Sequence, residues 1–223
     1  MSDDATIIAI DGPAGAGKST VGRAVAHELG LEYLDTGAMY RAVTFAVLRR
    51  GIDPGDTEDV ARVADSLEMT IGEDGVVVDG VDATVEIRGR EVTAAVSAVA
   101  ANSAVRSALV ERQRRWVAER GGGVVEGRDI GSVVFPDADL KLYVTASPRV
   151  RAERRVAEIG GDVDEVEASI IERDRKDSSR SDSPLLEADG ATVVDTTGLS
   201  IDEVVARILD QLPEGTSDSE RVR

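Results

Sequence analysis

The stretch "IAIDGPAGAGKST", residues 8–20, changes its character within a few positions. An apolar run ends at Asp11, three glycines follow, and the stretch closes on Lys18, Ser19 and Thr20. The apolar run predicts a buried strand, and the residues after Lys18 have the pattern of a helix. Between a strand and a helix, a glycine-rich turn allows successive backbone N–H groups to point inward and bind an anion. The stretch therefore predicts an α/β protein that holds a phosphorylated ligand.

The spacing from Gly12 to Ser19 matches the phosphate-binding loop, or P-loop, Gly-x-x-x-x-Gly-Lys-Ser. In such a loop the lysine reaches the outer phosphates of a nucleoside triphosphate, and the following hydroxyl ligates Mg²⁺. We therefore expect a nucleoside triphosphate and Mg²⁺, with Ser19 as the metal ligand. A turn that only joins strand to helix would leave Lys18 and Ser19 unexplained. The residues expected to bind the nucleotide are Gly12, Pro13, Ala14, Gly15, Ala16, Gly17, Lys18, Ser19 and Thr20.

Composition restricts the possible partners and compartment. The chain has 223 residues, 42% of them hydrophobic, no cysteine and a net charge of −17. Such a charge argues against a nucleic-acid polymer as partner, and no apolar run reaches the roughly 20 residues of a membrane span. The absence of cysteine and of a signal peptide favours the cytoplasm. A salt-rich cytoplasm or an arginine-biased genome would each explain the acidity, and we expect the single histidine, His27, to be structural.

Short apolar segments alternate with longer helical ones, which predicts a single α/β domain with a parallel sheet flanked by helices. Helix starts are expected at Ser147-Pro148 and at Ser200, which begins a capping box with Glu203. The last helix should stop by Pro213, and residues 214–223 form a flexible tail. The five expected strands are Thr6–Asp11, Leu31–Asp35, Val124–Glu126, Leu140–Thr145 and Thr192–Asp195.

Two segments interrupt this alternation. Met69–Val85 contains small strands and tight turns, which predicts a β-rich insert. Arg149–Arg180 is dominated by charge and predicts a helical hairpin with Gly160-Gly161 at its tip. Two interpretations of the hairpin are open: a solvated surface element, or a mobile lid that carries arginines.

Arginines in an acidic protein suggest how a phosphorylated ligand is held. Phosphoryl transfer requires two polyphosphates to be brought together with their charge neutralised, and the guanidinium group binds phosphate oxygens in pairs. Each arginine alone could equally form a surface ion pair. Glu126, at the end of a predicted strand, could order a metal ion or only terminate the strand. The arginines in question are Arg41, Arg128, Arg173, Arg175 and Arg180.

Five stretches together resemble the bacterial-type cytidylate kinases. They are "DGPAGAGKST", "YLDTGAMYRA", "VVEGRDIGSVVFPDADLKLYV", "ERDRKDSSR…SPL" and "TTGLSIDEVV", and the resemblance runs from about Ile7 to about Leu212. It implies a P-loop nucleoside monophosphate kinase that phosphorylates CMP and dCMP with ATP and Mg²⁺ and acts as a monomer. It also implies a core of about residues 5–35, 116–148 and 188–213, a monophosphate-binding region of about 36–115, and a lid of about 149–182.

The resemblance assigns roles to individual positions. Thr36 and Arg41 match residues that contact the monophosphate nucleotide, and Ser97 and Arg106 match positions near the cytosine and its phosphate. Arg128 and Asp129 match the pair that reads the cytosine edge. The residues that match phosphate and sugar contacts made on lid closure are Arg173, Asp177 and Arg180. The set expected to act in catalysis is Lys18, Arg128, Asp129, Arg173 and Arg180.

Departures from the family pattern keep alternatives open. Gly89-Arg90 stands where Thr-Pro is frequent, and the lid tip "EIGGDVDE" is short, so no adenine contacts are assigned to the lid arginines. A UMP/CMP-type or shikimate kinase is the nearest rival, although Gly121-Gly122-Gly123 precedes a strand and is expected to form an ordinary turn. A nucleotide-dependent switch or an adaptor with a vestigial loop is a more distant alternative, because no guanine-reading motif is visible.

Overall fold

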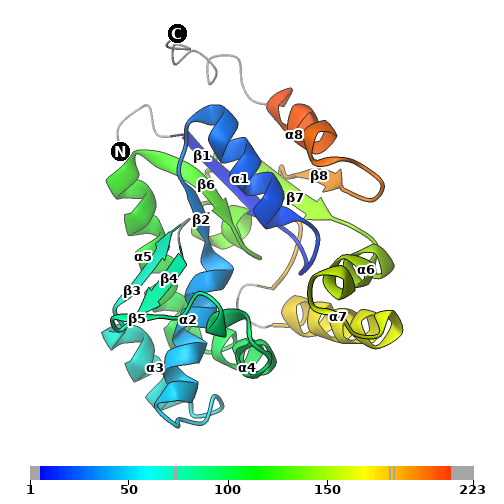
Figure 1. The fold of residues 1–223 in the computed structure, drawn as a ribbon. Coiled ribbons are helices and arrows are strands. Elements are labelled where there is room, and N and C mark those ends of the chain that lie inside the picture. Colours follow the sequence, from blue (N-terminus) through cyan, green and yellow to red (C-terminus); the bar gives the residue numbers. More distant parts are fainter. Residues whose placement is uncertain (1–5, 73–74, 181, 183, 212–223) are drawn as a thin grey trace.

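The computed structural model describes residues 6–72, 75–180, 182 and 184–211 (Figure 1). Its centre is a five-stranded sheet with the order β2–β6–β1–β7–β8, in which every neighbouring pair is parallel. This confirms the expected parallel α/β sheet. The strands are β1 (Thr6–Asp11), β2 (Tyr33–Asp35), β6 (Gly122–Glu126), β7 (Leu140–Thr145) and β8 (Thr192–Asp195).

Both faces of the sheet are buried, because helices pack against each of them. Successive side chains of a strand point to opposite faces and so enter different cores. In β1, Ile8 and Ile10 pack into the core on one face, whereas Ile7 and Ala9 pack into the core on the other. Helices α1 (Lys18–Leu29) and α8 (Ile201–Leu209) complete the first core, and α2 (Thr36–Arg49) and α5 (Ser103–Arg120) contribute to the second.

Two strand boundaries differ from the expectation. Strand β2 begins at Tyr33 rather than Leu31, and β6 begins at Gly122 rather than Val124. Only Gly121 of the glycine triplet therefore lies in a turn, where it ends α5 with a left-handed backbone. Gly123 belongs to the strand, and a Cβ there would lie 2.7 Å from the Trp116 ring. The later glycines thus allow β6 to pass close to its neighbours.

The predicted β-rich insert is confirmed as a separate antiparallel sheet with the order β3–β4–β5. It packs beside α2, which begins directly after the carboxyl end of β2 (Figure 1). Helix α4 begins after Gly89, which has no side chain to cap it. The elements of this region are α3 (Thr57–Ser66), β3 (Met69–Gly72), β4 (Gly75–Val78), β5 (Val81–Asp82), the 3₁₀ turn Glu86–Arg88 and α4 (Arg90–Ala100).

The predicted helical hairpin consists of α6 (Pro148–Ile159) and α7 (Val163–Ser178), which pack side by side (Figure 1). Ser147 caps α6 by accepting a hydrogen bond from the N–H of Val150, as its sequence signal predicts. The predicted capping box at Ser200 is also present in α8. Pro213 and the tail 214–223 lie outside the described residues.

Candidate functional site

The P-loop joins the middle strand of the sheet to α1, as predicted. Gly12, Gly15 and Gly17 all have a positive φ, which glycine adopts without strain. A Cβ on Gly12 would collide with the backbone carbonyl of Val144, so the close approach of the loop to β7 requires glycine there. Gly17 precedes α1 without offering a capping side chain, so the N–H groups of the first turn of α1 point to a place where an anion would be stabilised.

Lys18 and Ser19 lie at the carboxyl edge of the sheet beside Glu126. The Lys18 ammonium donates to the carbonyl of Pro13 at 2.9 Å, and the Ser19 hydroxyl donates to Glu126 Oε1 at 2.9 Å. Burial and the nearby Arg128 lower the pKa of Lys18, and burial raises the pKa of Glu126. Both effects favour the uncharged forms, and a bound phosphate or cation would oppose them.

Two cavities meet at this edge of the sheet. The larger, about 940 Å³, lies against the P-loop from Ala14 to Val21, and the smaller, about 80 Å³, lies between α2, α4, α5 and α7. Their walls share Lys18, Arg41, Ser97 and Arg173, so a group could pass from one cavity to the other across these four side chains.

The smaller cavity brings together every residue that the resemblance assigned to the acceptor nucleotide. Its walls also include Lys18 and Glu126, so that six cationic side chains face three carboxylates in a protein of net charge −17. A dianionic ligand would be attracted to this local excess of positive charge. The assigned residues in its wall are Thr36, Arg41, Ser97, Arg106, Arg128, Asp129, Arg173, Asp177 and Arg180.

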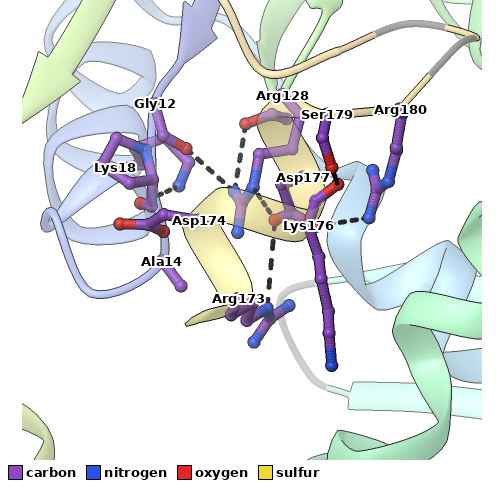
Figure 2. Close-up of polar contacts among 12 residues, drawn as sticks. Gly12, Ala14, Lys18, Arg128, Arg173, Asp174, Lys176, Asp177, Ser179 and Arg180 are labelled. Carbon is purple, nitrogen blue, oxygen red and sulfur yellow. Dashed lines mark hydrogen bonds and ion pairs between the residues drawn. The ribbon is translucent and has the colours of Figure 1, made fainter. Parts of the chain in front are cut away.

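Asp177 on α7 holds three arginines around one buried carboxylate (Figure 2). Arg128 Nε donates to its Oδ2 at 3.1 Å, Arg180 pairs with its Oδ1, and Arg173 Nε lies 4.0 Å away. Arg128 also donates to the carbonyl of Gly12 at 2.9 Å and so connects α7 to the P-loop.

Arg173 has the features of an anion-binding side chain. Its buried Nε has no hydrogen-bond partner among the described residues, and burial together with Arg128 lowers its pKa to about 10. An unpaired buried donor is costly unless a ligand accepts from it. Arg175, two residues along the same helix, pairs with Glu172 on the surface instead and faces neither cavity.

Asp129 forms an ion pair that could not be predicted from the sequence. The carboxylate forms a buried ion pair with Arg106 of α5 through Oδ2, and Arg106 also lies over the ring of Tyr40. Tyr40 lines the smaller cavity as well and was missed by the sequence reasoning, although it lies within the quoted motif "DTGAMYR". Thr36 donates to the carbonyl of Glu126 at 2.6 Å, so its hydroxyl oxygen can still accept from a ligand.

The structure also shows where Arg41, His27 and the remaining P-loop residues lie. Arg41 lies in helix α2 and donates to the carbonyl of Ile87 at 2.8 Å and to the hydroxyl of Thr93 at 3.0 Å. The side chain of His27 is 88% exposed and lines neither cavity, so it supports neither the core nor the site. Gly12, Pro13 and Ala16 belong to the P-loop but not to the wall of the larger cavity.

The oxygen atoms beside Lys18 fit a magnesium ion. Glu126 Oε2 is buried and has no hydrogen-bond partner among the described residues, and Ser19 Oγ lies within hydrogen-bond distance of the same carboxylate. Across the described ranges no cluster of three His, Cys, Asp or Glu side chains could hold a metal by itself. Mg²⁺ is commonly held by one or two protein oxygens together with substrate phosphates, which matches this sparse donor set.

A parallel sheet with a phosphate-binding loop after its middle strand, beside a cavity rich in arginine, defines a P-loop kinase. The fold is shared with a gluconokinase from Sinorhizobium meliloti 1021 (TM-score 0.51, 16% identity, 93% of this chain and 91% of that one) and with an uncharacterized protein from Eubacterium ventriosum (TM-score 0.55, 12% identity, 96% and 99%). More specifically, the chain belongs to the cytidylate kinase family, whose model matches residues 8–214.

Curated relatives differ in their overall length. A cytidylate kinase of Rhodococcus opacus (strain B4) is 50% identical over 218 residues, which cover 94% of this chain and 95% of that protein. A bifunctional pantoate ligase/cytidylate kinase of Synechococcus sp. (strain RCC307) is 52% identical over 214 residues, which cover 91% of this chain but 42% of that protein. The chain therefore spans less than half the length of some relatives and nearly all of others. Among the described residues, no single helix is long and apolar enough to cross a membrane.

Proposed function

We propose that the protein transfers the γ-phosphoryl group of ATP to CMP and dCMP, which yields ADP with CDP or dCDP. The observation that carries this proposal is the meeting of the two cavities at Lys18, Arg41, Ser97 and Arg173. The larger cavity would take ATP on the P-loop, and the smaller would take the acceptor nucleotide. Family membership and the named cytidylate kinases among the relatives support the same reaction.

In this proposal the protein contributes position and charge, because phosphoryl transfer needs little covalent chemistry from side chains. Lys18, Arg128, Arg173 and Arg180 would neutralise the transferred group and the acceptor phosphate. Ser19 and Glu126 would hold Mg²⁺, which when bound offsets the charge of the donor phosphates. We assign no nucleophile to the protein, since the acceptor oxygen belongs to the monophosphate.

Asp129 and Arg106 would select the base. Asp129 pairs with Arg106 through Oδ2, and its other oxygen, Oδ1, would accept from the exocyclic amine of cytosine. A guanidinium would donate to the ring nitrogen and carbonyl. Uracil would place a carbonyl oxygen against this carboxylate and leave a buried group unsatisfied, at a cost of about 1–3 kcal/mol. We therefore expect preference for CMP over UMP of roughly ten- to a hundredfold.

Two larger regions of the chain would have separate roles. Residues of about 36–115 would bind the monophosphate, and the hairpin of about 149–182 would close as a lid and exclude water. We also propose a monomer, because a single chain supplies the walls of both cavities. A cytoplasmic location agrees with the absence of cysteine from the sequence.

A coupled ADP-release assay tests the function directly. CMP, dCMP, UMP, AMP and shikimate are offered as acceptors at low and at high salt, and phosphate release is measured without an acceptor. We expect fast ADP release only with CMP and dCMP and near-idle hydrolysis without an acceptor. Fast turnover of shikimate, or hydrolysis that no acceptor accelerates, would point to one of the rival functions.

A further inference from the structure

The residues that follow Asp129 form one turn of π-helix, Ile130–Val134, whose two ends are held by opposite charges. At the amide end, the N–H groups of Ile130 and Gly131 donate to Asp11 Oδ1 and Oδ2, each at 2.8 Å. At the carbonyl end, Arg114 of α5 donates to the carbonyls of Val133 at 2.9 Å and of Val134 at 3.0 Å. The turn is thus held between β1 and α5.

Asp11 also links this turn to the P-loop. It is the last residue of β1, and the next residue, Gly12, accepts from Arg128 through its carbonyl. Three hydrogen bonds therefore fasten residues 128–131 to the point where β1 becomes the loop. Any shift of Asp129 relative to the P-loop would have to break at least one of them.

Stability alone does not explain a carboxylate at this position. Asp11 is only 3% exposed, and burial, opposed by its two N–H donors, still raises its pKa to about 6. Its ionised form is therefore less favourable in the fold than in water. The ionised carboxylate nonetheless supplies two acceptors to two N–H donors, which a neutral amide of the same shape does not.

We infer that Asp11 is a positioning residue of the acceptor site, which acts by presenting Asp129 to the pyrimidine base at a set distance from the P-loop. Arg114 supports the same turn from its other end. This inference rests on the proposed function, because it takes Asp129 to be the base-reading carboxylate. The effect of losing Asp11 should fall on CMP and on base selectivity, and not on ATP.

The test is the full-length Asp11→Asn variant, with Asp139→Asn as a matched control. Asp139 likewise accepts from a backbone N–H of β1, that of Ile7 at 2.8 Å, but lines neither cavity. For Asp11→Asn we expect the KM for CMP to rise about tenfold, the preference for CMP over UMP to fall, and the KM for ATP to stay within about twofold. Asp139→Asn should leave all three unchanged.

A second pair of variants approaches the turn from outside, where folding is less at risk. Arg114→Ala should raise the KM for CMP about threefold, whereas Arg115→Ala should not. Arg115 lies on the same helix, and within the described part of the chain its only ion pair is with Glu111. Unchanged KM for CMP and unchanged base preference in both Asp11→Asn and Arg114→Ala would overturn the inference, as would equal increases for CMP and ATP. A wild-type protein without CMP turnover would overturn the proposed function as well.

Discussion

At the scale of single residues, the candidate site contains both charged groups that are paired with each other and a charged group that keeps an unpaired hydrogen-bond donor. Asp177 and Asp129 are buried carboxylates that hold guanidinium groups in place, whereas Arg173 keeps a buried donor without a partner in the part of the chain that the structure describes. A buried charge is tolerated when it is paired, and an unpaired donor gains most from an incoming anion. The paired residues therefore set the geometry, and Arg173 is available to the ligand.

Lys18 offers the simplest test at this scale. Lys18→Ala removes the ammonium that we assign to the transferred phosphoryl group, and we expect kcat to fall by roughly two orders of magnitude or more. Its one hydrogen bond is to a carbonyl of its own loop, so the melting temperature should change little. The control is Lys141→Ala, which removes a bond to Asp189 away from both cavities. A near-normal kcat in Lys18→Ala would contradict the assignment.

Asp11 makes a pH-dependent contribution to stability. Because folding raises its pKa from 3.8 to about 6, the folded state favours the protonated form. This preference stabilises the folded state fully below about pH 4, and the stabilisation is lost as the pH rises through 6. The loss in unfolding free energy amounts to about 3 kcal/mol, at about 1.4 kcal/mol per pKa unit. The amide in the Asp11→Asn variant does not titrate, so the unfolding free energy of this variant should improve relative to wild type between pH 4 and pH 7. The unfolding free energies of both proteins are measured by denaturant titration at each pH. If the two curves of unfolding free energy against pH ran parallel, Asp11 would have an ordinary pKa in the folded protein.

At the scale of elements, the loops at the carboxyl ends of β1 and β6 carry the residues to which we assign the chemistry, and close backbone contacts shape these loops. Gly12 packs its backbone against Val144 of β7. Gly127 leaves so little space that a Cβ would lie 2.7 Å from Ile130 and 2.8 Å from the hydroxyl of Thr36. These glycines allow the strands to end close together, which brings the P-loop and the acceptor residues to one edge of the sheet.

Gly12→Ala tests this close contact. The added methyl group would collide with the backbone carbonyl of Val144, and alanine would also be strained at the positive φ of Gly12. Because the P-loop must then move, we expect ATP affinity to fall by at least about tenfold and the melting temperature to fall as well. The control is Gly30→Ala, which also has a positive φ but open space around its Cβ. It should cost about 1 kcal/mol of stability and leave ATP binding intact, as isothermal titration would show. Equal ATP affinities in the two variants would refute the steric argument.

At the scale of the whole molecule, the α6–α7 hairpin is joined to the sheet mainly through its inner, buried side. Arg151 of α6 donates to the carbonyls of Ala146 and Ala14, and it pairs with Asp174 of α7 at 2.7 Å. Arg149 joins the same two helices on the exposed side, where it pairs with Asp164 and Glu167. The inner arginine therefore connects the proposed lid to the P-loop, and the outer one does not.

Arg151→Ala should separate these two roles. It removes the contact with Ala14 and leaves the partly buried carboxylate of Asp174 without its partner, and we expect a loss of about 2 kcal/mol in stability and an increase of about tenfold in the KM for ATP. Arg149→Ala breaks exposed pairs that contribute less than about 1 kcal/mol and should leave the KM unchanged. If both variants behaved alike in thermal melts and ATP titrations, the hairpin would not be coupled to the loop through Arg151.

Strand β1, the P-loop and the start of α1 could be predicted from residues 6–20 alone. The α6–α7 hairpin and the capping box of α8 could likewise be predicted from their own local sequences. These features depend on neighbouring residues, whose backbone preferences act over a few positions. The ends of β2 and β6 could not be predicted as closely, because contacts such as that of Gly123 with Trp116 decide where a strand can begin.

The identity of the acceptor residues followed from the resemblance of their motifs, but their partners did not. Arg106 meets Asp129 across 23 positions, Arg128 meets Asp177 across 49, and Asp11 meets Ile130 across 119. In the sequence, Arg173 and Arg175 look alike, yet one faces both cavities and the other faces solvent. The sequence by itself determined which charges the chain carries and where its P-loop lies between β1 and α1. Tertiary packing alone decided which charges are buried and paired, because that depends on distances between segments that no local pattern encodes.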